Sequence, residues 1–78
     1  MLILLKSDKH SEACRVQGMH SAIREAEHRA AQWKEPVDIW VLCPERRVRT
    51  LQAIVNADGT TETASPNIVG PPLKSVLY

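Results

Sequence analysis

The sequence predicts a small α+β domain, in which an antiparallel β-sheet carries one helix on one of its faces. Two observations support this prediction. Residues 21–35 repeat apolar side chains at steps of three and four, as an amphipathic helix does. Residues 2–6, 37–43 and 48–57 are apolar runs that indicate strands, and the last two alternate apolar with polar positions. The element order β(β)αββ fits one sheet covered by one helix.

Two strands are expected before the helix. Residues 2–6 are apolar on both faces, which is typical of a central strand covered on two sides. Residues 7–12 are polar and indicate a loop. Residues 13–17 form a possible second strand, with Cys14 and Val16 on one of its sides.

The helix prediction depends on its apolar stripe and on its two ends. Most of the stripe is alanine, so the helix can lie close to a flat sheet. The stripe consists of Met19, Ala22, Ala26, Ala30 and Trp33. Ser21 suits an N-cap because its hydroxyl can accept a backbone N–H of the first turn, and Pro36 disfavours helical geometry at the preceding residue. On the polar face, Glu25 and Arg29 form a favourable i,i+4 pair.

Two long strands and a short one are expected after the helix. Residues 44–47 form the turn between strands 37–43 and 48–57, and the Asp58-Gly59 pair predicts a tight turn before an edge strand at 60–63. Alternation predicts which side chains face the helix: Val37, Ile39, Val41 and Cys43, and then Leu51, Ala53, Val55 and Ala57. The opposite face is expected to carry Asp38, Trp40 and Leu42.

Residues 1–63 are predicted to form one domain, and residues 64–78 an extended C-terminal arm. Three prolines keep this arm out of a sheet interior, but its apolar residues favour packing on the body or on a neighbouring subunit. One helix covers only one sheet face, so apolar side chains on the other face favour a homodimer. The residues predicted to take part in self-association are Leu42, Leu73, Leu77 and Tyr78.

The bulk composition argues against several classes of protein. A net charge of +1 is unlike that of a nucleic-acid mimic, and it is too small for nucleic-acid binding by bulk charge alone. The apolar start turns polar at Lys6, too early for a signal peptide or a membrane span, so no membrane contact is expected. Secreted chains of this size usually hold more than two cysteines, so Cys14 and Cys43 indicate reduced thiols in a cytoplasm.

The motifs predict no catalytic, cofactor or metal site. The possible metal ligands lack the CxxC, HxxxH and HExxH spacings of zinc sites; they are His10, Cys14, His20, His28 and Cys43. The sequence contains no GxSxG motif for a nucleophile, and its scattered glycines form no phosphate-binding loop. We therefore expect a protein without enzymatic activity and without a cofactor.

The sharpest charged feature is a group of arginines next to the predicted 44–47 turn. Arg46, Arg47 and Arg49 can form bidentate hydrogen bonds with an acidic protein surface or with phosphates. Together with Trp40 on the exposed sheet face, they are the predicted partner-binding residues. Few aromatic residues are available for base stacking, so nucleic acid is expected to be contacted only through its backbone. The simplest alternative is a solvated hairpin tip.

Two resemblances bear on function. The opening LLKSDKHSEA resembles the start of YCII-related proteins, a strand followed by a KxDxxSEAG-type turn, but Cys14 replaces the glycine and no catalytic His–Asp pair is visible. A small sheet, an Ala/Glu/Arg helix introduced by a serine, a VDIWVL strand and a hairpin are similar to small phage and mobile-element proteins. Anti-CRISPR proteins belong to that group and act by occupying a surface of a CRISPR effector. For this chain the resemblance therefore implies steric blocking and not chemistry.

The sequence therefore predicts a non-enzymatic protein-binding module. Its most specific form is a phage-type, anti-CRISPR-like inhibitor that sterically blocks a bacterial defence complex in the host bacterial cytoplasm. The expected partner is another protein or protein complex, with a CRISPR effector as the specific candidate. Two alternatives stay open: a small nucleic-acid-binding module that uses the arginine hairpin on phosphates, and a small YCII-like enzyme.

Overall fold

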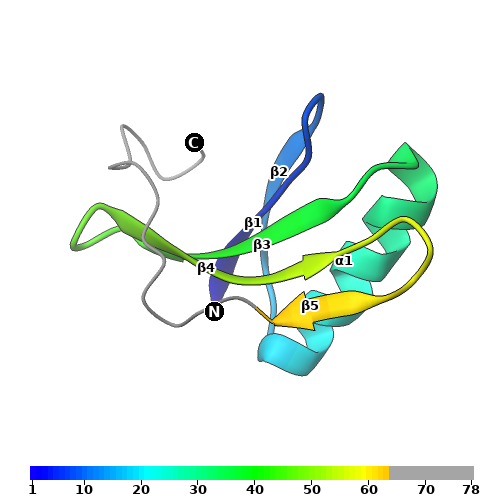
Figure 1. The fold of residues 1–78 in the computed structure, drawn as a ribbon. Coiled ribbons are helices and arrows are strands. Elements are labelled where there is room, and N and C mark those ends of the chain that lie inside the picture. Colours follow the sequence, from blue (N-terminus) through cyan, green and yellow to red (C-terminus); the bar gives the residue numbers. More distant parts are fainter. Residues whose placement is uncertain (64–78) are drawn as a thin grey trace.

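The computed structural model describes residues 1–63, and in this range it shows the predicted α+β fold (Figure 1). The elements are β1 (Leu2–Lys6), β2 (Ser11–Arg15), α1 (Met19–Trp33), β3 (Val37–Cys43), β4 (Val48–Val55) and β5 (Thr61–Thr63). The five strands form one antiparallel sheet in the order β2-β1-β3-β4-β5, and α1 packs against one face of it. The predicted arm at 64–78, with its self-association residues Leu73, Leu77 and Tyr78, lies outside the described residues.

The main core lies between α1 and the sheet. The alanine stripe of the helix is buried as predicted, at Ala22, Ala26 and Ala30. The sheet contributes larger buried side chains to the same cluster: Ile3, Leu5, Val37, Ile39, Ala53 and Val55. Because alanine is short, the helix backbone can approach the sheet closely, and the strands supply most of the apolar volume.

The helix begins and ends two residues earlier than the sequence predicts. Gly18 is the N-cap, without a side-chain hydrogen bond, and its carbonyl accepts the Ala22 N–H at 3.0 Å. Ser21 lies inside the first turn, so the predicted Ser21 cap is wrong. At the other end, Lys34 adopts a left-handed backbone with φ of 58°, and its N–H donates to the Ala30 carbonyl at 2.8 Å. The helix therefore ends at Trp33 with Lys34 as its C-cap, so it does not reach Glu35, the residue at which Pro36 disfavours helical geometry.

Strand β1 is central, as predicted. Ile3, Leu4 and Leu5 are fully buried although they point alternately to both faces of the sheet. Strand β2 lies two residues earlier than the predicted 13–17 strand, because Ser11 and Glu12 pair with the end of β1. An edge strand has one solvated side, so it tolerates these polar residues.

A β-bulge changes the face on which β4 places one residue. Ile39 pairs with Ala53, but the next residue, Trp40, pairs with Leu51, so Gln52 is an extra residue in β4. Directly paired residues share a sheet face, so Leu51 lies with Trp40 on the side away from the helix. The prediction that Leu51 faces the helix is therefore wrong.

We call the side of the sheet away from α1 the distal face; its apolar cluster consists of Leu2, Leu4, Ala13, Trp40 and Leu42. Leu4 is fully buried and Leu42 is 5% exposed.

Strand β4 ends at Val55, so Ala57 is an exposed turn residue and not the inward-facing strand residue that the sequence predicts.

The Asp58-Gly59 turn is confirmed, and it is closed by one carboxylate. Gly59 has a φ of +95°, which side chains rarely tolerate. The Asp58 Oδ1 atom accepts the Thr60 backbone N–H at 2.9 Å and the Thr60 hydroxyl at 2.7 Å. These hydrogen bonds, first the backbone and then the side-chain one, lower the pKa of Asp58 from its ordinary value of 3.8.

This turn predicts a pH-dependent contribution to stability. A lowered folded-state pKa means that Asp58 stabilises the fold above pH 3.8, and that this stabilisation is lost as the pH falls through the folded-state pKa. Asp58→Ala is therefore expected to lower the melting temperature by more at pH 7 than near pH 2. Thermal melts at both pH values measure the difference, with Glu27→Ala on the exposed helix face as the control. An Asp58→Ala effect that persists undiminished in acid would contradict the assignment.

Candidate interaction surface

Several chain segments meet at one end of the sheet. Because neighbouring strands are antiparallel, β1 begins where β2 and β3 end. The turn between β3 and β4, residues 44–47, lies at the same end and projects beyond the helix (Figure 1). We call this region the hairpin end; among the described residues, α1 does not cover it.

The hairpin turn holds two adjacent arginines on an ordered backbone. The Arg46 N–H donates to the Cys43 carbonyl and the Arg47 N–H to the Pro44 carbonyl, each at 3.2 Å. Arg47 has a left-handed backbone with φ of 53°. Both arginine side chains are exposed. The predicted placement of Arg46 and Arg47 on the turn is therefore confirmed, and their predicted role in binding stays a prediction.

Arg49 lies apart from the other two arginines. It is part of β4, where it pairs with Leu42 on the distal face, and it is only 4% exposed. Its guanidinium carbon lies 4.6 Å from the centroid of the half-buried Trp40 ring, within range of a cation–π interaction. Arg49 and Trp40 therefore stabilise each other within the sheet, and the exposed tip consists of Arg46 and Arg47.

A cleft of about 500 Å³ lies beside the hairpin turn at this end of the sheet. It is lined by Leu2, Arg15, Leu42, Cys43, Pro44 and Glu45. Leu42, Leu2 and Pro44 contribute apolar surface, whereas the exposed Arg15 and Glu45 contribute opposite charges. Of the predicted self-association residues, Leu42 lies here, and it is nearly buried.

Sequence reasoning missed Arg15 and Glu45. These residues are thirty positions apart, and only the antiparallel register brings the end of β2 to the end of β3. The signal that could have found them is the strand order. If β1 lies between β2 and β3, the end of β2 at Arg15 falls at the same end of the sheet as the turn after β3, which holds Glu45. The prediction placed β2 two residues too late, so it did not identify Arg15 as the end of that strand.

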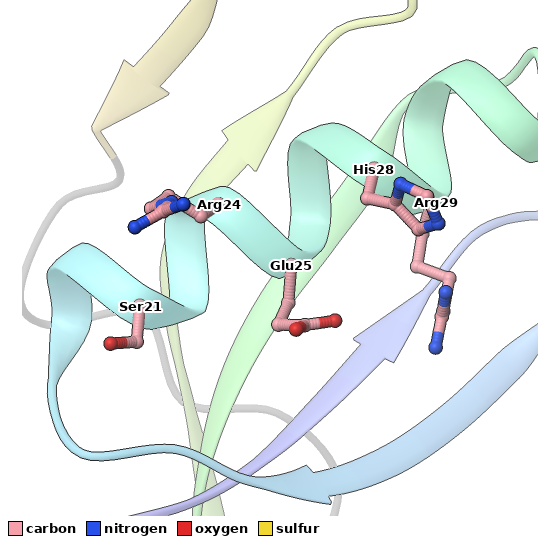
Figure 2. A pocket seen from close by; sticks show the side chains of 5 residues that line it. All are labelled: Ser21, Arg24, Glu25, His28 and Arg29. Carbon is pink, nitrogen blue, oxygen red and sulfur yellow. The ribbon is translucent and has the colours of Figure 1, made fainter.

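The exposed side of α1 carries a second, shallower hollow of about 530 Å³. It is lined by Ser21, Arg24, Glu25, His28 and Arg29, which Figure 2 shows along successive turns of the helix. The Arg29 guanidinium forms a bidentate ion pair with Glu12 of β2, with Nη2–Oε1 at 2.8 Å and Nε–Oε2 at 3.1 Å. Arg29 therefore joins the helix to the edge strand β2 through Glu12. The sequence instead predicted that Arg29 pairs with Glu25 of the same helix.

The two cysteines and three histidines do not meet in one place. Burial, followed by the charges of Glu25 and Glu12, raises the pKa of the Cys14 thiol, which keeps it protonated near neutral pH. Cys43 lines the cleft, and the His10 ring stacks on Trp33 with a centroid distance of 4.8 Å. Within residues 1–63, no group of three or more acidic, histidine or cysteine side chains is placed to hold a metal.

The opposite end of the sheet carries a cavity of about 270 Å³, lined partly by Ser7, Asp8, Glu35 and Asp38. The Ser7 hydroxyl donates to Glu35 Oε2 at 2.8 Å and accepts the His10 N–H at 3.1 Å. These bonds join the β1–β2 turn to the chain after the helix. Burial, together with the charge of Asp8, raises the pKa of Asp38. We assign a structural role to this network.

Comparison of the chain with protein-family models, curated proteins and solved structures gave no match. In the part of the chain that the structure describes, no helix is long and apolar enough to cross a membrane. The function must therefore be argued from the geometry of the hairpin end.

Proposed function

We propose that this protein is a non-enzymatic protein-binding module that contacts its partner through the hairpin end. The observation that supports the proposal is that two exposed arginines, Arg46 and Arg47, lie next to a cleft with apolar lining. Protein interfaces typically combine an apolar centre with a polar rim, and arginine is enriched among their strongest contacts. An ordered turn also lowers the entropy cost of binding, because its backbone is already fixed.

The specific form of the proposal is a phage-type, anti-CRISPR-like inhibitor that acts in the bacterial cytoplasm. Such an inhibitor would occupy a surface of a defence complex, with a CRISPR effector as the specific candidate. The support for this form is the layout of sheet, helix and hairpin, which is analogy at the level of the fold. Steric blocking needs affinity and shape, so it is compatible with a protein that has no catalytic group.

The test is capture of partners from bacterial lysate with the tagged full chain, with and without nuclease, followed by mass spectrometry. A stoichiometric protein partner that survives nuclease is expected. The double variant Arg46→Glu with Arg47→Glu is expected to reduce its recovery about tenfold or more, because reversed charges repel an acidic surface. Lys9→Glu with Arg24→Glu is the matched control, since it makes the same change in charge at exposed sites away from the hairpin end.

Two outcomes would contradict the proposal. One is the absence of any nuclease-resistant partner, and the other is equal loss of recovery in the hairpin variant and in the matched control. Both double variants must first show the far-ultraviolet circular dichroism and the melting temperature of the unmodified chain, so that unfolding cannot account for a loss.

The exposed arginine pair also favours a second candidate, a module that contacts nucleic-acid phosphates. Binding through Arg46 and Arg47 alone would neutralise two phosphates, so log K is expected to fall with log salt at a slope of about −1.8 for duplex DNA. Titration of duplex and single-stranded DNA at several salt concentrations measures this slope. Loss of the captured partner on nuclease treatment would favour this candidate over the protein-binding one.

A further inference from the structure

The lining and the charges of the cleft at the hairpin end indicate which chemical groups a partner must present there. This inference rests on the proposed function. We propose that the cleft receives an apolar side chain from a partner segment that carries carboxylates on both sides of that side chain. Three features of the cleft support this: its apolar lining, its size, and the excess of positive charge around it.

Leu2, Leu42 and Pro44 form the apolar lining of the cleft. Leu2 and Pro44 are only half-buried, so they retain apolar surface that a partner can cover. A volume of about 500 Å³ is large enough to hold a leucine or an aromatic side chain. Removing such a side chain and the cleft surface from water favours binding. Nucleic-acid phosphates offer no comparable apolar group.

The exposed side chains at the hairpin end carry an excess of positive charge. Arg15, Arg46 and Arg47 contribute three positive charges, and Glu45 contributes one negative charge. The whole chain has a net charge of only +1, so this excess is local. A second copy would bring two positive hairpin ends together, whereas an acidic segment would complement them. The charges therefore favour an acidic protein segment over a second copy of this chain.

The experiment is a titration of the ¹⁵N-labelled full chain with short peptides, followed by ¹H–¹⁵N correlation spectra. The probe is Ac-Glu-Asp-Leu-Asp-Glu-NH2. It is expected to shift the amide signals of Leu2, Leu42 and Cys43, and to leave those of Arg24 and His28 on the exposed helix face unchanged. Replacing the probe's leucine with serine is expected to weaken binding about fivefold or more, because the cleft then receives no apolar group.

A matched pair of variants separates cleft contacts from general electrostatic attraction. Arg15→Glu removes a positive charge from the cleft wall, and Arg24→Glu makes the same change on the exposed helix face. Arg15→Glu is expected to abolish the shifts, whereas Arg24→Glu retains them. Arg15→Gln, which removes the charge without reversing it, is expected to weaken binding less than Arg15→Glu.

Several outcomes would overturn the inference. The first is no shift at the cleft with the acidic leucine peptide at about 10 mM, a concentration tenfold above a Kd of about 1 mM. The second is equal binding of the serine peptide, or preferential binding of Ac-Lys-Lys-Leu-Lys-Lys-NH2 or of a short DNA duplex. The third is cleft shifts that depend on protein concentration without any peptide, which would assign the cleft to a second copy.

Failure of this inference can be distinguished from failure of the proposed function. If a nuclease-resistant partner is captured and Arg15→Glu leaves its recovery unchanged, the cleft inference fails and the protein-binding proposal stands. If no protein partner is captured, the protein-binding proposal fails. Selective cleft shifts with the acidic leucine peptide would then still establish the ligand chemistry of the cleft itself.

Discussion

Replacing Ile39 with alanine is expected to lower the free energy of unfolding by about 2–5 kcal/mol. Ile39 is fully buried in β3, between Leu5 of β1 and Ala53 of β4, and it belongs to the cluster beneath α1. The buried helix residues of this cluster are alanines, which are too short to fill the cavity that the substitution creates. The cost is therefore expected in the upper part of the range.

Urea denaturation of the full chain measures this effect, and Ile54→Ala is its control. Ile54 is the same residue type in the neighbouring strand β4, but it is half-buried and lies outside the cluster under the helix. Its replacement is expected to cost less, because fewer contacts are lost and solvent can fill the space. Equal losses in the two variants would contradict the placement of the core between α1 and the sheet. The core of a domain of this size rarely supplies more than about 3–5 kcal/mol, so Ile39→Ala is expected to lose most of its folded baseline at 25 °C. Its far-ultraviolet circular dichroism without urea then measures the loss.

The core could be predicted from the sequence because its two signals are local and periodic. The alanine stripe of the helix recurs every three to four residues, and Val37 and Ile39 alternate with polar or distal-face residues. Each pattern identifies a face without knowledge of what covers it. A sheet packed against one helix is then the simplest way to bury the apolar face of the helix against an apolar face of the sheet.

The bulge in β4 could not be predicted in the same way. Leu51, Ala53 and Val55 alternate regularly, so the sequence of β4 contains no sign that Gln52 is an extra residue. The bulge exists only in the pairing with β3, where Trp40 takes Leu51 as its partner. The predicted cap at Ser21 is wrong for a local reason. Gly18, in the connection between β2 and α1, has an extended backbone and serves as the N-cap, so the helix begins at Met19.

The candidate surface shows the same division between local and long-range information. Arg46 and Arg47 could be placed at the hairpin tip from the Pro44-containing turn alone. The burial of Arg49 against Trp40 depends on strand register. The cleft depends on topology, because Leu2, Arg15 and Glu45 come from three separate segments of the chain. Sequence reasoning therefore identified the exposed Arg46 and Arg47, and it missed the cleft beside them together with its charged residues Arg15 and Glu45.

Replacing Ala26 with leucine is expected to destabilise the fold by about 1–3 kcal/mol, because the side chain adds volume where there is no space. Ala26 is fully buried at the centre of the helix stripe, directly against the sheet cluster. The larger side chain must either adopt a strained rotamer or push α1 away from the strands. For a domain of this size, each kcal/mol lowers the melting temperature by about 4–8 °C, so the shift is readily measured.

Ala31→Leu is the matched control, because Ala31 is an exposed residue of the same helix. Leucine is nearly as good a helix former as alanine, so this change is expected to alter stability by less than about 0.5 kcal/mol. If Ala26→Leu melts at the same temperature as Ala31→Leu, the close approach of helix and sheet is wrong.

The Ala26→Leu variant also tests whether a loss of stability in the core affects binding at the hairpin end. The hairpin end projects beyond α1, so Ala26→Leu, at a temperature where it remains folded, is expected to retain the affinity of the unmodified chain for the acidic leucine peptide.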